Sequence, residues 1–158
     1  MARSPSPSLD TFVTALQSDK RVVHVERSPA RRARFATLAE PLSKTVAGII
    51  PEQGLWSHQA ESIDHIRAGR SVAIATGTAS GKSLCFQLPI AEAIAAGPLP
   101  ATALLLFPTK ALAQDQLRSL TALNVPGLIA ATHDGDSSPE ARKWTCAHAN
   151  VLLTNPEM

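Results

Sequence analysis

The sequence predicts an α/β fold in which a parallel β-sheet is covered by helices on both faces. Three observations support this prediction. From residue 55 onward, short apolar runs alternate with segments of helical spacing, and the connections between them are short. A glycine-containing loop also separates the first apolar run from the helix that follows it. Alternation of this kind is typical of parallel strands joined by crossover helices.

The first 54 residues lack this alternation. The Ser/Pro-rich start, residues 1–8, is expected to be disordered because it has almost nothing to bury. Residues 9–18 place Leu, Phe and Val side chains at helical spacing, which predicts a short amphipathic helix, and the β-branched run 21–26 suggests a strand. Prolines and the absence of a clean period indicate a linker or wrapping segment up to Pro51. We therefore expect an irregular N-terminal extension at 9–54, followed by an α/β domain at 55–158.

The elements of this domain follow from its apolar spacing and its capping residues. Thr109 is a favourable N-cap, and Gly69 and Gly97 are plausible helix ends. In chain order, we expect a helix at 57–68, a strand at 71–76, a helix from Gly81 to Gly97, a strand at 102–108, a helix at 109–123, a strand within 127–136, a helix at 138–149 and a strand at 150–154. Trp144, in the last of these helices, is expected to anchor the core.

Composition sets the broad class of protein. A chain of 158 residues, 44% of them hydrophobic, is long enough for one domain with a sizeable core. No apolar stretch approaches the roughly 20 residues of a membrane helix, and the start lacks the apolar segment of a signal peptide. A cytoplasmic protein without membrane partners is therefore expected. The two cysteines, Cys85 and Cys146, lie far apart and predict reduced thiols rather than a disulfide or zinc site.

Positive charge is concentrated near the N-terminus although the net charge is only +2. The segment 26–34, "ERSPARRAR", holds four arginines. It is either a solvated basic segment or a contact for a phosphate backbone, and the sequence leaves both readings open.

The stretch "ATGTASGKSLCF", residues 75–86, predicts a phosphate-binding loop. It lies between an apolar run and a helix, the arrangement that directs backbone N–H groups and the positive helix end at a phosphate. Small residues would let the backbone approach closely. Lys82 is expected to neutralise the β- and γ-phosphates of a nucleotide, and the Ser83 hydroxyl to bind Mg²⁺. The residues expected to bind the nucleotide from this loop are Thr78, Ala79, Ser80, Gly81, Lys82 and Ser83. Thr76 stands where the general pattern has its first glycine.

Several motifs in order, "ATGTASGKS", "FPTKALAQDQ", "HDGD" and "TNPEM", resemble the first RecA-like domain of superfamily 2 helicases of the DEAD/DEAH type. In that group the loop commonly lacks the first glycine, which accounts for Thr76. The segments "VVHVERSPARRARFATL" and "GLWSHQAESI" are similar to the YprA-like helicases, which join a DEAH motor to a C-terminal zinc-binding region. The resemblance covers about residues 20–158 and implies a P-loop NTPase fold. Trp56 and His133 depart from it, since tyrosine is expected at both.

The resemblance implies roles for further residues. Gln59 corresponds to the glutamine that reads the adenine edge of ATP. A second set corresponds to loops that contact single-stranded nucleic acid: Pro108, Thr109, Lys110, Gly135, Asp136, Thr154, Asn155 and Pro156. Independently of the resemblance, a helix start with a Thr cap and a Lys favours phosphate. The resemblance also implies ATP and Mg²⁺ as cofactors, and it favours single-stranded or duplex DNA as partner, with RNA left open, and a role in repair.

The sequence reaches Met158 before any Asp-Glu-Ala-His run. We therefore expect an incomplete RecA-like domain, and we expect that this chain alone neither hydrolyses ATP appreciably nor unwinds DNA. Three interpretations remain open. The chain is the N-terminal portion of an ATP-dependent DNA helicase, a non-catalytic module that binds nucleotide or single strands, or a small P-loop kinase. Strand binding with a steep salt dependence separates the first two from the third.

Overall fold

The computed structural model describes residues 9–17, 19, 21–26, 32–97 and 100–156. The chain divides into two compact units, 1–32 and 33–158. The first contains helix α1, Leu9–Gln17, which has no buried residue. The helix expected at 9–18 is therefore confirmed, whereas the strand suggested at 21–26 is wrong, because these residues form a turn and irregular backbone. The expected tail at 1–8 lies outside the described residues, as do residues 27–31 of the basic segment.

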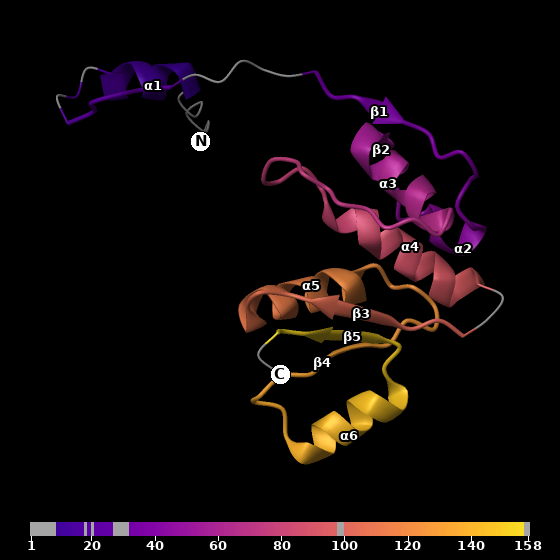
Figure 1. Cartoon of the computed structure of the whole chain (residues 1–158). Coiled ribbons are helices and arrows are strands. Elements are labelled where there is room, and N and C mark those ends of the chain that lie inside the picture. The colour runs from indigo at the N-terminus through magenta and orange to yellow at the C-terminus, as the bar shows by residue number, and fades with distance from the viewer. Residues whose placement is uncertain (1–8, 18, 20, 27–31, 98–99, 157–158) are drawn as a thin grey trace, which may run out of the picture. The chain divides into compact units, whose positions relative to one another are not determined.

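The second unit begins with a segment that packs against its helices (Figure 1). Strand β1, Phe35–Ala36, pairs antiparallel with β2, Leu55–Trp56, and the short helix α2, Lys44–Ala47, lies between them in sequence. Leu42, Val46 and Leu55 are buried in the same core as α3 and α4. The residues 33–54 thus contribute to the core of the second unit rather than connecting it to the first.

Two helices follow. Helix α3, Ser57–Arg67, begins directly after β2, and helix α4, Ser83–Ala96, begins after the loop at 76–82. Ile63 of α3 and Leu88 of α4 are fully buried in the core they share with Val46. Both helices lie where the sequence predicts them, because their apolar positions recur at helical spacing.

A three-stranded parallel sheet forms the rest of the unit. Its order is β3-β5-β4, with β3 at Ala103–Leu106, β5 at Val151–Thr154 and β4 at Ala130–Thr132. Leu152 is opposite Leu104 on one side and Ala131 on the other. Helix α5, Lys110–Ala122, joins β3 to β4, and α6, Pro139–His148, joins β4 to β5. These three strands and both crossover helices confirm the α/β prediction.

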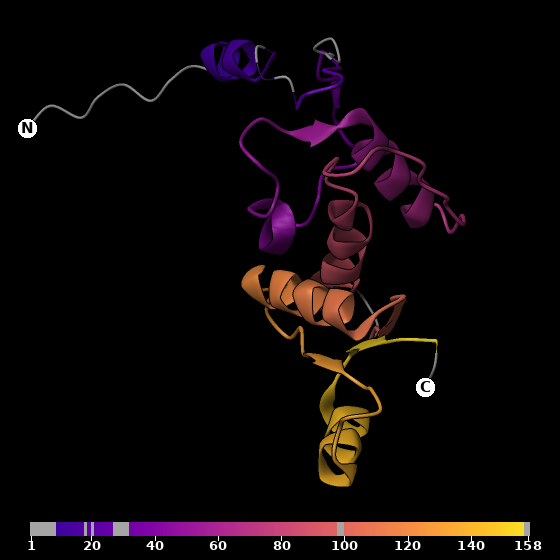
Figure 2. The same ribbon diagram turned by 90° about the vertical axis from the view of Figure 1, so that its left-hand side faces the viewer.

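Helices lie on both sides of this sheet. Two views place α4 and α5 on one side and α6 on the other (Figures 1 and 2). Leu105, Val151 and Leu153 pack against Ile90 and Leu120 on the α4 and α5 side. Leu104 and Leu106 alternate with them and are each 60% exposed. Trp144 of α6 is half exposed and stacks on His148, so its expected role as a core anchor is wrong.

The strand expected at 71–76 is not formed. These residues are irregular and pair with no strand among the residues that the structure describes. An apolar run becomes a strand only when a neighbouring strand accepts its backbone hydrogen bonds. Val72 and Ile74 are half-buried and line a hollow with His58, Glu61 and His65 of α3. The run therefore lies against α3.

In the described part of the chain, no helix is both long and apolar enough to cross a membrane.

Candidate functional site

The loop before α4 has the backbone shape of an anion-binding turn. Ala79 and Gly81 both have positive φ, +56° and +70°. Alternation of left-handed and right-handed residues turns successive N–H groups toward one concave face. Ala79 adopts this conformation although it is unfavourable for a residue with a side chain, which is typical of functional loops. The loop leads into α4 at Ser83, so the positive end of a 14-residue helix lies at its base.

The ammonium group of Lys82 is held within this loop. Its Nζ donates to the carbonyl oxygens of Thr76 and Gly77 at 3.1 and 2.5 Å, and to the hydroxyl of Ser80 at 3.3 Å. The Ser80 hydroxyl lies 2.7 Å from that of Thr76. Thr76 therefore closes the loop through its side chain, a contact that glycine could not make.

Side chains of helix α3 contact the backbone of the loop. The buried side chain of Gln59 donates from Nε2 to the carbonyl of Gly81 at 2.8 Å and accepts from the Trp56 amide at 2.9 Å. A Cβ on Gly81 would lie 2.6 Å from Gln59 Nε2, so the close approach requires glycine here. His58 Nε2 lies 3.0 Å from the carbonyl of Ser80. Sequence reasoning assigned His58 no role at the loop, and no local pattern indicates one.

These residues fit a magnesium-bound nucleoside triphosphate. The left-handed positions and the start of α4 supply N–H donors, Lys82 supplies a cation, and Ser83 places a hydroxyl at the first helical position. Trp56 is 40% exposed beside Gln59 and makes edge contacts with the rings of Phe35 and His58 at centroid distances of 6.0 and 6.1 Å. These aromatic rings, next to the loop, are compatible with stacking on the flat ring of a nucleobase.

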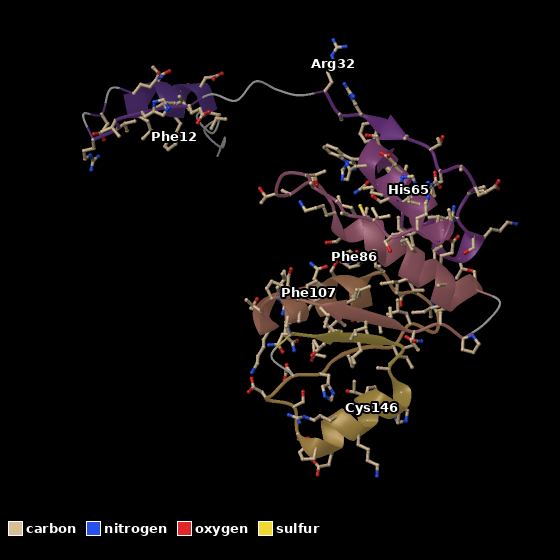
Figure 3. All side chains as sticks on the ribbon, in the orientation of Figure 1. Phe12, Arg32, His65, Phe86, Phe107 and Cys146 are labelled. Atoms are coloured by element: carbon tan, nitrogen blue, oxygen red, sulfur yellow. The ribbon has the colours of Figure 1, made fainter. Side chains whose placement is uncertain are left out.

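A second group of candidate residues lies at the carboxyl end of the sheet. The amide of Phe107 donates to Thr154 O at 2.9 Å, and that of His133 donates to Leu153 O at 2.8 Å. The hydroxyl of Thr154 donates to His133 O at 2.6 Å. The three strand ends therefore meet at one edge, and Figure 1 shows the arrowheads of β3 and β5 pointing toward it. Figure 3 labels Phe107, which packs on the core beneath this edge.

Two loops at this edge are linked by an ion pair. Thr109 caps α5, accepting from the Leu112 amide at 3.3 Å, and Lys110 is the first residue of that helix. Lys110 Nζ lies 2.6 Å from Asp136 Oδ2, in the loop after β4. The structure thus brings the adjacent Thr109 and Lys110 next to Asp136, which lies 26 positions after Lys110 in sequence.

The loop that carries Asp136 is ordered by its own side chains. Asp134 Oδ1 accepts from the Asp136 amide and from the Ser137 hydroxyl, at 3.1 and 3.0 Å. Arg142 of α6 donates to the carbonyls of Asp134 and Gly135, both at 3.2 Å. Sequence reasoning missed Arg142, since only the folded chain brings α6 back beneath this loop.

Asn155 occupies a different setting from its neighbours. It is only 5% exposed, whereas Pro156 and Gly135 are exposed. Its Oδ1 and the Nδ1 of His133 are buried without a hydrogen-bond partner among the described residues. Such atoms are costly to leave unpaired. A bound group that hydrogen-bonds to these two atoms, at the ends of β4 and β5, would therefore be favourable.

The two cysteines differ in burial. Burial raises the pKa of the Cys85 thiol, and smaller effects of Ser62 and Lys82 lower it without reversing this direction. Cys146 is exposed on α6 (Figure 3). We expect alkylation at pH 8 to modify Cys146 on the order of 100-fold faster than Cys85, as measured by mass spectrometry of tryptic peptides over time. Equal rates would contradict the buried position of Cys85 next to the loop.

Comparison with known proteins identifies the family. The family model described as DEAD/DEAH box helicase matches residues 56–158, which include both groups of candidate residues. The chain belongs to the DEAD/DEAH box helicase family. This confirms the resemblance inferred from the motifs.

Relatives of this helicase chain agree with the assignment. It is 36% identical over 143 residues to the ATP-dependent helicase HRQ1 of Saccharomyces cerevisiae, covering 87% of this chain and 13% of that protein. It is 33% identical over 157 residues to the uncharacterized ATP-dependent helicase YprA of Bacillus subtilis, covering 96% and 21%. A crystal structure of the DUF1998 helicase MrfA bound to DNA and AMPPNP matches with a TM-score of 0.83 at 32% identity, covering 96% of this chain and 22% of MrfA. The chain thus spans about a fifth or less of the length of these relatives.

Proposed function

We propose that this chain is the ATP-binding and strand-binding portion of an ATP-dependent DNA helicase. The observation that carries the proposal is Lys82 within a loop of two left-handed residues at the start of α4. The match to MrfA bound to DNA and AMPPNP over 96% of the chain supports both ligands. A cytoplasmic location fits this function.

The proposed roles follow from the contacts. To bind ATP, the Lys82 ammonium exchanges the carbonyls of Thr76 and Gly77 for phosphate oxygens, while the loop amides and the positive end of α4 hold the same phosphates. Ser83 is the proposed Mg²⁺ ligand. Gln59 links this loop to the residue before α3, because its amide bonds both Gly81 and Trp56. In the longer helicase, bound ATP would supply the phosphoryl group whose transfer to water drives movement along the strand.

The carboxyl edge of the sheet is the proposed path of the nucleic-acid strand. Thr109 and Lys110 present a hydroxyl, an ammonium and the start of a 13-residue helix to a phosphate. Pro108, Gly135 and Pro156 are exposed at the same edge. Thr154 and Asn155 are the remaining proposed strand contacts, and Asp136 belongs to the site as the ion-pair partner of Lys110.

A strand-binding titration tests this proposal. We expect Lys110→Ala to weaken binding of a single-stranded oligonucleotide about five-fold at low salt and to make the slope of log K against log salt less steep by at most about 0.7, the value for one lost phosphate contact on a single strand. Fluorescence anisotropy of the protein across a salt series measures both quantities.

Lys44→Ala is the matched control, because Lys44 is an exposed lysine on α2, remote from the edge in sequence. Equal losses in the two variants would remove Lys110 from the strand site. Absence of salt-dependent strand binding, together with retained nucleotide binding, would instead favour a small P-loop kinase.

A further inference from the structure

We infer that Asp136 competes with nucleic-acid phosphate for Lys110 and so sets the affinity and the salt response of strand binding. This inference rests on the proposed strand-binding function. According to this inference, Asp136 weakens strand binding instead of contacting the strand. Its carboxylate takes the position of a phosphate while no strand is bound.

The geometry supports competition. Asp136 Oδ2 lies 2.6 Å from Lys110 Nζ, the distance of a strong charge-assisted hydrogen bond. The carboxylate is an anion next to the first turn of α5, where the helix end also favours negative charge. A phosphate of a bound strand has the same charge and the same kind of acceptor oxygen. The carboxylate and the phosphate therefore use the same ammonium group.

Asp136 is held in position for this contact. Its own amide is bonded to Asp134 Oδ1, and Arg142 holds the preceding carbonyls of Asp134 and Gly135. The loop therefore loses little additional conformational freedom when the ion pair forms. Because α6 fixes the loop and α5 fixes Lys110, the pair depends on two separate elements of the fold.

The exposure of the pair makes the competition reversible. The side chains of Lys110 and Asp136 are 43% and 80% exposed. Ion pairs in such settings are weak and screened by salt, so a strand can displace the carboxylate. After displacement Asp136 attracts a cation from solution, which partly offsets the counterions released from the strand. Asp136 thus lowers both the affinity at low salt and the steepness of its salt dependence.

Replacing Asp136 by asparagine tests the inference. We expect Asp136→Asn to bind a single-stranded oligonucleotide about three-fold more tightly than wild type at low salt, with a slope of log K against log salt that is steeper by about 0.5. The gain should disappear as the salt concentration rises. Asparagine retains the size of the side chain and its backbone amide, so the loop contacts at Asp134 remain.

Asp115→Asn is the control of equal charge. Asp115 forms an exposed ion pair with Arg118 on the same helix, at 3.2 Å, and its replacement changes the net charge by the same amount without touching Lys110. A gain in Asp115→Asn equal to that in Asp136→Asn would overturn the inference, since net charge alone would then explain the effect.

A double variant separates this inference from the function on which it rests. In a Lys110→Ala background, the gain from Asp136→Asn should fall to that of Asp115→Asn. A gain that persists in full would mean that Asp136 repels the strand directly, and competition for Lys110 would be wrong.

If Lys110→Ala itself leaves binding unchanged, the proposed strand site fails. If Lys110→Ala weakens binding but Asp136→Asn gains nothing, only the inference fails.

Discussion

Lys82→Ala is expected to weaken binding of ATP or AMPPNP by on the order of 100-fold, because it removes the cation that is proposed to bind the phosphates. The ammonium now bonds the carbonyls of Thr76 and Gly77 and the hydroxyl of Ser80. In the alanine variant these groups lose their cation, so the loop loses order as well as charge. Isothermal titration calorimetry with AMPPNP and Mg²⁺ measures the change.

Lys110→Ala is the matched control for this experiment. Each lysine lies at the start of a helix, Lys82 before α4 and Lys110 at the beginning of α5. Nucleotide affinity should stay within about two-fold of wild type in Lys110→Ala, since salt screens the effect of an exposed charge on a ligand that it does not contact. An affinity for AMPPNP that is unchanged in Lys82→Ala would exclude the loop as the phosphate site.

Arg67→Ala is expected to lower the free energy of unfolding of the second unit by about 2.5 kcal/mol, or roughly 8 °C in Tm. The Arg67 guanidinium donates to both carboxylate oxygens of Glu92, at 2.8 and 2.6 Å, and to the carbonyls of Glu40 and Pro41. Both charged side chains are only 21% exposed. Removing Arg67 leaves Glu92 without its cation and releases the segment before α2. Thermal unfolding followed by circular dichroism measures the loss.

The ion pair between Arg67 and Glu92 is expected to stabilise the fold to a similar extent at pH 6 and pH 9. The hydrogen bonds that Arg67 donates to the Glu92 carboxylate raise the pKa of Arg67 above its already high value. A raised pKa means that the contribution to stability is fully present below the unfolded value and is lost only at pH values far above neutrality. The effect of Arg67→Ala should therefore be similar at pH 6 and pH 9.

Arg118→Ala provides the comparison for Arg67→Ala. Arg118 pairs with Asp115 on the surface of α5, with side chains 73% and 62% exposed, and should contribute less than about 0.5 kcal/mol. If both variants unfold at the same temperature, Arg67 does not hold the segment 33–54 to the helices.

Local patterns were sufficient to predict most of the elements. Thr109 caps α5 as expected, since a Thr before a helical run satisfies the first amides whatever the tertiary context. The loop at 76–82 was also predictable, because Gly81, Lys82 and Ser83 stand directly before a helix. The lack of a strand at 71–76 was not predictable, because strand formation depends on a partner that is remote in sequence.

The remaining features depend on contacts between distant residues. Arg67 meets Glu92 across 25 positions, and Lys110 meets Asp136 across 26. Neither pair has a spacing that a sequence pattern reveals. The resemblance assigned Asp136 to the strand site, but only the folded chain shows that its carboxylate is bonded to Lys110. The packing of Leu42 and Val46 against α3 and α4 also depends on contacts between distant residues, so the sequence did not predict it. The prolines of this segment suggested a linker or wrapping segment.

The central proposal is that the loop before α4 binds ATP and that the carboxyl edge of the sheet binds a nucleic-acid strand. Hydrogen–deuterium exchange of the protein, with AMPPNP and Mg²⁺ or with an oligonucleotide added separately, tests it most directly. We predict that AMPPNP slows exchange at residues 77–84 and that the oligonucleotide slows exchange at 109–112 and 134–137. Protection by the oligonucleotide confined to other segments, or by AMPPNP anywhere but the loop, would contradict the account.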